Sequence, residues 1–137
     1  MRATAARLHL RRQLEAHLTE LGYSTVRVVR TAGPVPEIVR VSPIRGRIAY
    51  GETVLHADLA LRRCHERLLS FSQRRTRQRS SILFFIGVAE EDEAALNTLL
   101  EQLQIRTGTR GGHVHVIAIP RASTSHSRRT LVRAASA

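Results

Sequence analysis

Lysine is absent from this chain of 137 residues, and all 22 of its basic side chains are arginine. Tryptophan is absent as well, and cysteine occurs once, as Cys64. Without lysine no lysine-dependent catalysis is available, and a single cysteine excludes an internal disulfide framework. No apolar run approaches the roughly 20 residues of a membrane-spanning helix, and the basic start, Met1 to Arg12, lacks the apolar core of a secretory signal. We therefore expect a cytoplasmic protein without a membrane segment.

Acidic residues are half as numerous as arginines, 11 against 22, which gives a net charge of +11. So large a charge on a small protein points to an anionic partner, and arginine is well suited to bidentate phosphate contacts. Codon composition in a G+C-rich genome would also account for the arginine excess. The densest basic segment runs from Gln73 to Ser81. The candidates for contact with a nucleic-acid backbone, in this segment and in the helix predicted before it, are Arg63, Arg67, Arg74, Arg75, Arg77 and Arg79.

Hydrophobic spacing divides the chain into helices and strands. A helix is predicted where Leu10, Leu14 and Leu18 recur every four residues, and a strand buried on both faces is predicted where Ile82 to Val88 is continuously apolar. In chain order we expect a helix over Ala5–Leu21, a strand over Tyr23–Val29, a hairpin over Pro36–Val54, a helix over Ala57–Phe71, a strand over Ile82–Val88, a helix opened by Glu90–Glu93 and ended by Gly108–Gly112, and a strand over His113–Ile119.

This order predicts an α/β fold with a mixed central β-sheet. Three strands follow in antiparallel succession, and a helix that then leads into an all-apolar strand is typical of a right-handed crossover to a parallel neighbour. We expect one domain over residues 1–120, with an αβββαβ core and helices on both faces of the sheet. Residues 121–137 are rich in Ser, Thr, Arg and Ala without periodicity, which predicts a basic disordered tail.

The hairpin over Pro36–Val54 carries the clearest chemical signal in the sequence. If the chain folds back about a midpoint between Ile44 and Arg45, Glu37 falls opposite Glu52. Directly opposed residues have Cβ atoms about 4.5–5.5 Å apart, and like charges at that spacing are destabilising. The acidic pair therefore needs a compensating cation, which is either a metal ion or an arginine. A shift of one residue in the register would put the two carboxylates on opposite faces.

The element order and this motif together resemble the PD-(D/E)XK nuclease superfamily, which has the restriction-endonuclease-like fold. In that family a Pro-Asp pair opens the second strand and an acidic-x-Lys motif closes the third; Pro36-Glu37 stands at the first place and Glu52 at the second. The resemblance implies catalytic and metal-binding roles for Glu37 and Glu52, with Glu15 as a third metal ligand from the first helix and Glu20 as the alternative to it. The metal would be Mg²⁺ or Mn²⁺, which polarises the scissile phosphate and generates hydroxide. A homodimer is a further expectation from the resemblance.

The chain departs from the family pattern at two positions. Glu37 replaces the usual aspartate, and Val54 replaces the motif lysine. Valine can neither orient nor deprotonate a water molecule, and an arginine such as Arg40 or Arg63 would supply charge but stays protonated. We therefore expect a nucleic-acid-binding domain that contacts the backbone of DNA, with weak or lost phosphodiester hydrolysis.

Other interpretations stay open at this point. The two glutamates would, as ordinary surface residues, pair with Arg27, Arg40 or Arg47. The histidines fit no standard zinc-finger spacing, and Cys64 belongs to the apolar face of its predicted helix. At the level of function, the alternative is a structural or regulatory domain that binds protein and uses its charge for solubility. Retention on DNA that weakens steeply with salt would separate the two functions.

Overall fold

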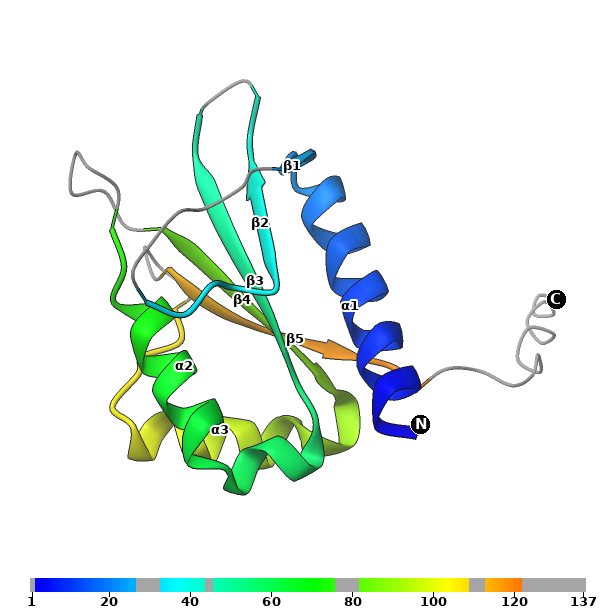
Figure 1. The fold of residues 1–137 in the computed structure, drawn as a ribbon, viewed down its shortest axis with the longest axis vertical. Helices are drawn as coiled ribbons and strands as arrows, with labels where there is room; N and C mark the ends of the chain where they lie inside the picture. Colours follow the sequence, from blue (N-terminus) through cyan, green and yellow to red (C-terminus); the bar gives the residue numbers. More distant parts are fainter. Residues whose placement is uncertain (1, 27–32, 44–45, 76–81, 109–112, 122–137) are drawn as a thin grey trace, which may run out of the picture.

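A computed structural model describes residues 2–26, 33–43, 46–75, 82–108 and 113–121 (Figure 1). This part of the chain has a mixed α/β fold, and the predicted order of helices and strands is confirmed. In chain order the elements are α1 (Arg2–Glu20), β1 (Thr25–Val26), β2 (Ile38–Val41), β3 (Ile48–Val54), the 3₁₀ turn η1 (His56–Ala60), α2 (Arg62–Ser72), β4 (Leu83–Ala89), the 3₁₀ turn η2 (Glu90–Asp92), α3 (Glu93–Gln102) and β5 (Val114–Ile119).

The strands form one sheet in the order β1-β2-β3-β4-β5. β2 is antiparallel to both β1 and β3, whereas β4 is parallel to both β3 and β5. The predicted crossover is therefore confirmed: α2 connects β3 to its parallel neighbour. β4 is buried along most of its length, because helices pack on both of its faces, and this explains its continuously apolar sequence.

The register of the hairpin agrees with the prediction from sequence. Ile38 pairs with Gly51, and Val41 pairs with Ile48. Glu37 directly precedes the paired part of β2, and Glu52 directly follows Gly51 in β3. The hairpin thus sets the two glutamates next to each other at one end of the β2–β3 ladder.

One face of the sheet is covered by α1, which approaches the strands closely. Gly51 and Gly87 leave room for Leu14: a Cβ atom built at Gly51 would lie 3.2 Å from Leu14 Cδ2, and one at Gly87 would lie 3.3 Å from it. The four-residue spacing of leucines in α1 is thereby explained as core packing. The buried residues on this face are Leu10, Leu14, Leu18, Tyr23, Ile38, Ala49, Phe85 and Ile119.

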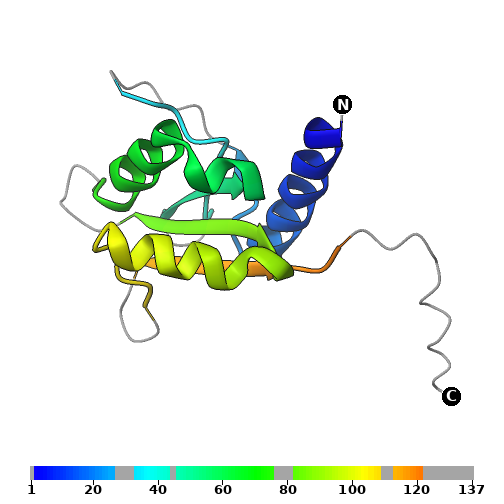
Figure 2. The same ribbon diagram turned by 90° about the horizontal axis from the view of Figure 1, so that it is seen from below.

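The opposite face is covered by α2 and α3, so helices lie on both faces as expected. Figure 2 shows α1 at the right of the molecule, apart from α2, with α3 in front. From the helices, Leu68, Phe71, Leu96, Leu99 and Leu100 are buried here, and from the strands Val39, Tyr50, Val54, Phe84, Ile86, Val88 and Val114.

The continuous helix predicted over Ala57–Phe71 is wrong at its start. The chain first forms η1, in which the carboxylate of Asp58 accepts a hydrogen bond from the backbone N–H of Leu55 at 2.9 Å. Leu61 then adopts an extended conformation, with φ −92° and ψ 128°, and α2 begins after it. An aspartate that binds the backbone of a preceding residue favours a tight turn over a regular helix. Leu61 is consequently half exposed rather than part of the apolar face.

Three other boundaries differ from the prediction. β1 is shorter than expected at its start, and positions 27–29 of the predicted strand lie outside the described residues. α3 ends at Gln102 rather than at the glycine-rich segment, and the chain turns at Gln104, where φ is 59°. Beyond Arg121, the predicted tail also lies outside the described residues. In the part of the chain that the structure describes, no helix is long and apolar enough to cross a membrane.

Candidate functional site

The two glutamates of the hairpin meet where β2 begins. Glu52 lies in the central strand β3 and is 5% exposed, and Glu37 is half-buried. The backbone N–H of Glu37 donates a hydrogen bond to Glu52 Oε2 at 2.7 Å. The structure therefore brings the predicted pair together, although the contact runs from the backbone of one residue to the carboxylate of the other.

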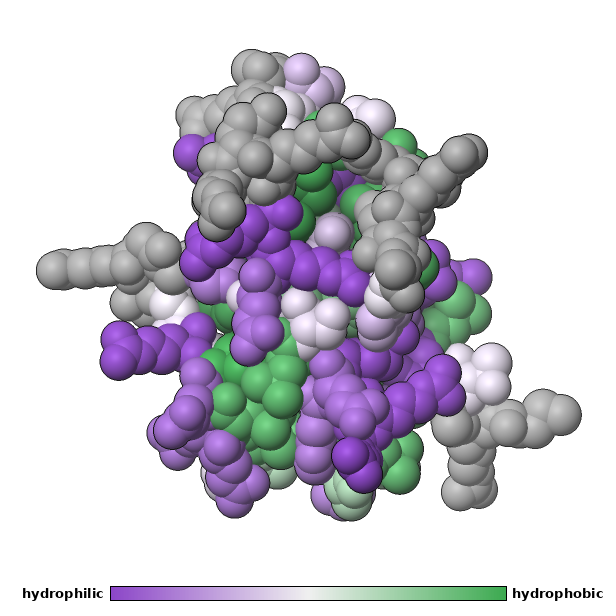
Figure 3. Space-filling model, turned by 60° about the vertical axis from the view of Figure 1, so that its left-hand side comes forward, coloured by the Kyte–Doolittle hydropathy of each residue, from purple (hydrophilic) through white to green (hydrophobic). Residues whose placement is uncertain are grey.

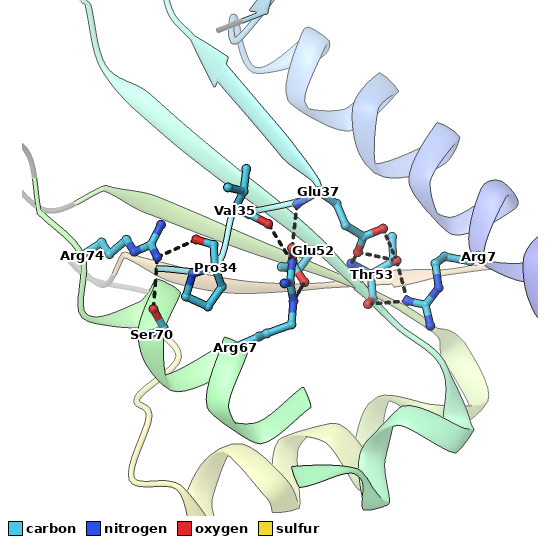
Figure 4. A network of polar contacts seen from close by, with 9 residues as sticks. All are labelled: Arg7, Pro34, Val35, Glu37, Glu52, Thr53, Arg67, Ser70 and Arg74. Atoms are coloured by element: carbon cyan, nitrogen blue, oxygen red, sulfur yellow. Dashed lines mark hydrogen bonds and ion pairs between the residues drawn. The ribbon is translucent and has the colours of Figure 1, made fainter. Parts of the chain in front are cut away.

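The cation beside Glu52 is Arg67 of α2. Arg67 donates from Nη2 to Glu52 Oε2 at 2.8 Å and from Nε to Glu52 Oε1 at 3.1 Å, a two-point ion pair (Figure 4). Nη2 also donates to the backbone oxygen of Val35 at 2.9 Å. Burial raises the pKa of Glu52, an effect that the hydrogen bond from Arg67 opposes, and the same bond raises the pKa of Arg67. Both oxygens of this buried carboxylate are therefore bound by groups of the chain itself.

The carboxylate of Glu37 binds Thr53 instead, the residue that follows Glu52 in β3. Glu37 Oε1 accepts hydrogen bonds from the backbone N–H of Thr53 at 2.6 Å and from its hydroxyl at 2.7 Å. Thr53 is also held from α1, because Arg7 donates from Nη1 to its backbone oxygen at 3.1 Å. Arg7 Nη2 donates in turn to Asp58 Oδ2 at 2.7 Å, an ion pair between α1 and η1. The glutamates are thus part of a network that joins both helical layers to β3.

Glu15, the third predicted metal ligand, lies away from this pair. Its carboxylate accepts a hydrogen bond from Arg40 of β2 at 3.0 Å and a longer one, 3.4 Å, from Arg11. Arg40 pairs in the sheet with Ala49, whose side chain is buried under α1, whereas Glu52 binds Arg67 of α2 on the other face. The structure therefore does not bring Glu15 and Glu52 into one ligand set.

The acidic pair as arranged does not fit a magnesium or manganese ion. Mg²⁺ needs open oxygen ligands in near-octahedral geometry, but Arg67 takes both oxygens of Glu52, and Thr53 takes Glu37 Oε1. The position of the family's lysine is Val54, which is 2% exposed and packs in the core. Among the described residues, no three His, Cys, Asp or Glu side chains form a group that could hold a metal ion. What the arrangement provides is a buried ion pair between Glu52 and Arg67.

The predicted nucleic-acid contacts fall into three groups. Arg63 and Arg75 are exposed, whereas Arg67 is bound to Glu52. Arg74 donates from Nη2 to the backbone oxygen of Pro34 at 2.6 Å, and its guanidinium lies 4.9 Å from the ring centroid of Phe71. The remaining two, Arg77 and Arg79, lie outside the described residues. Arg67 and Arg74 therefore hold the segment before β2 onto α2, a structural role that the sequence did not suggest.

A cavity opens beside this network. It has a volume of about 350 Å³ and lies between residues of α1, β3, η1 and α2. Its charged lining consists of Arg7, Arg63, Arg67, Glu37, Glu52 and Asp58. A second cavity, of about 550 Å³, lies between the end of α2 and the segment after α3 and includes His113, which is bound to the backbone oxygen of Ser72 at 2.6 Å. Only the first contains predicted site residues with charged partners, so it is the candidate functional site.

Sequence reasoning missed Arg7 and Asp58 at this site. Arg7 is one of several arginines in α1, and nothing in the spacing distinguishes it from its neighbours. Asp58 could have been noticed as an acidic residue three positions after Leu55, the spacing at which an aspartate binds the backbone of a preceding residue. Neither signal would have shown that the two side chains meet.

Comparisons of the chain with protein-family models, with curated proteins and with solved structures found no match. The resemblance to the PD-(D/E)XK nucleases therefore stays a prediction from the sequence.

Proposed function

We propose that this chain is a cytoplasmic nucleic-acid-binding domain, related to the PD-(D/E)XK nucleases, that has lost phosphodiester hydrolysis. The observation that carries this proposal is the two-point ion pair between Arg67 and Glu52. In a metal-dependent nuclease, a carboxylate at this place of the hairpin holds the metal ion. Here a guanidinium supplies the positive charge, and it brings no water molecule that could be activated.

The charge of the chain supports nucleic acid as the partner. Within the described residues, thirteen arginines stand against all eleven acidic residues, and the other nine arginines belong to the remaining segments. The described residues are therefore almost neutral, and most of the excess positive charge belongs to the rest of the sequence. Figure 3, which brings the α2 side forward, shows hydrophilic residues across the middle of this face, with a hydrophobic area below them and smaller ones elsewhere. A hydrophilic face of this kind suits contacts with phosphate groups, and it is less suited to an extended apolar interface with another protein.

Two measurements on the purified protein test this function. Binding to duplex DNA, followed at increasing salt, should weaken steeply, because phosphate contacts release counterions. Incubation of plasmid and branched DNA with Mg²⁺ or Mn²⁺ should give no cleavage, for the wild type and for Glu52→Gln alike. Cleavage that is present in the wild type and lost in Glu52→Gln would overturn the loss of hydrolysis. Absence of salt-dependent binding to DNA and RNA would overturn the nucleic-acid function and favour a protein-interaction domain.

A further inference from the structure

Most of the carboxylate oxygens that line the cavity beside Glu52 already accept hydrogen bonds, whereas one of its arginines, Arg63, makes none within the described residues. Glu52 accepts hydrogen bonds at both oxygens, and Glu37 accepts two at Oε1. Asp58 Oδ2 accepts from Arg7 and from the backbone of Leu55. A cation that entered the cavity would compete with these bonds for most of the carboxylate oxygens.

The arginines of the same lining are less fully used. Arg63 is exposed and makes no hydrogen bond or ion pair with any residue that the structure describes. Arg67 uses Nε and Nη2, and its Nη1 has no partner within the described ranges. Arg7 is about a third exposed at its side chain. The N-terminal turn of α2 adds backbone donors, because Leu61 precedes it without a side-chain cap and the turn contains no acidic residue.

From this balance we infer that the cavity binds a phosphate group of the nucleic acid, with Arg63 as its principal contact and Arg67 and Arg7 beside it. The inference rests on the proposed function and names the ligand of the same site. A guanidinium binds phosphate through two parallel hydrogen bonds, and a cavity of about 350 Å³ is large enough for one such group with its adjoining sugar. The site has thus changed from one that would hold a cation to one that holds an anion, with Arg67 bound to the old carboxylate ligand.

The group that enters can be a phosphate at the end of a strand or one within it. Both sources present the same oxygens to Arg63, and two oligonucleotides that differ only in a 5′-phosphate distinguish them. Tighter binding of the phosphorylated oligonucleotide indicates a terminal phosphate, and equal binding of the two indicates an internal one.

The test compares Arg63→Gln with Arg62→Gln in the full chain. Arg62 is the matched control, because it is adjacent in α2, its side chain is 91% exposed, and it pairs with Glu66 rather than lining the cavity. Each variant removes one positive charge, so a general effect of charge is the same in both. We expect Arg63→Gln to weaken oligonucleotide binding about tenfold, as befits the loss of a charge-assisted hydrogen bond, and Arg62→Gln to weaken it by less than about twofold.

Inorganic phosphate provides a second measurement that does not depend on nucleic acid. Titrated into the wild-type protein, it should shift the NMR signals of Thr53 and Cys64, which line the cavity, and should leave them unshifted in Arg63→Gln. Equal weakening by the two variants, or no phosphate-dependent shift at the cavity, would overturn the phosphate site even if DNA still binds. If phosphate shifts these signals but no oligonucleotide binds, the proposed function fails and the anion site stands.

Discussion

Two carboxylate–arginine pairs lie on opposite faces of the sheet, and they differ in what surrounds them. On the α1 face, Glu15 is paired with Arg40 at 3.0 Å, and its side chain is 30% exposed. On the α2 face, Glu52 is paired with Arg67 through two hydrogen bonds, and its side chain is 7% exposed. The sequence predicts both glutamates as ligands of one metal ion, yet the sheet separates them.

The difference in burial of the two carboxylates decides how much the loss of each arginine lowers the free energy of unfolding. The arginines do not differ in that direction, because Arg40 is 14% and Arg67 24% exposed. The carboxylates do: Glu15 keeps contact with water, so its pair contributes about 0–1 kcal/mol. A buried pair contributes little net energy when intact, but removal of one partner leaves an uncompensated charge in a site of low polarity. Glu52 and Arg67 therefore depend on each other, whereas Glu15 and Arg40 do not.

The largest expected effect comes from removing the buried cation. Arg67→Met should lower the free energy of unfolding by about 3–5 kcal/mol, because it leaves Glu52 without its counterion and the backbone oxygen of Val35 without its donor. Arg40→Met, the matched change on the other face, should cost less than about 1 kcal/mol. Urea unfolding of the two variants measures both values. Equal losses would show that burial does not distinguish the pairs.

The hairpin was accessible to sequence reasoning because its signals are local. The turn residues around Pro43 and Gly46 fix the point at which the chain folds back, and that point sets the register. Once the register is set, the adjacency of Glu37 and Glu52 follows from counting residues. The apolar run of β4 predicted its parallel place beside β3 in the same way, because burial on both faces leaves a continuous pattern.

The partners of the glutamates were not accessible, because they depend on how separate elements pack. Arg67 was predicted as a nucleic-acid contact, and its position in α2 gives no sign that it faces Glu52 rather than solvent. That contact depends on where α2 begins, and the beginning is set by Asp58, whose carboxylate closes η1 and shifts the helix start to Arg62. Each residue of an α-helix turns the side-chain direction by about 100°, so the non-helical residues before Arg62 break the phase that a continuous helix would give.

The next largest loss of stability is expected on the other face of the sheet, where α1 packs closely against the strands. A methyl group added by Gly51→Ala would lie 3.0 Å from Ile38 Cβ and 3.2 Å from Leu14 Cδ2, so the helix or the hairpin must move. We expect a loss of about 1–3 kcal/mol in the free energy of unfolding. Gly87→Ala is the comparison and should cost less, because its nearest contacts, Ile119 Cδ1 at 3.1 Å and Leu14 Cδ2 at 3.3 Å, are both ends of side chains, whereas Gly51 meets Ile38 Cβ. A greater loss in Gly87→Ala would contradict this account of the packing.

A smaller effect is expected in the pH dependence of the buried pair. Because burial raises the pKa of Glu52 above the ordinary 4.5, the folded protein keeps a proton at Glu52 where the unfolded chain has lost it. The resulting stabilisation is present at low pH and is lost as the pH rises from 4.5 through the raised pKa. The free energy of unfolding of the wild type, relative to Glu52→Gln, should therefore fall over this window and then level off. A rise instead would mean that Arg67 outweighs burial and lowers the pKa of Glu52.

The smallest effect on stability is expected at the thiol on the α2 face, where burial changes reactivity instead. Burial, followed by the negative charges of Asp58 and Glu52, raises the pKa of Cys64 from 9.0 to about 11. At neutral pH the thiolate, which is the reactive form, is then about a hundredfold scarcer than in an exposed cysteine. Since Cys64 is the only cysteine, the rate of alkylation by iodoacetamide reports on this site alone, and it should be about a hundredfold below that of a cysteine peptide. Unfolding in urea should restore the rate of the cysteine peptide. If the folded protein already reacts at that rate, Cys64 does not experience the buried charges of the α2 face.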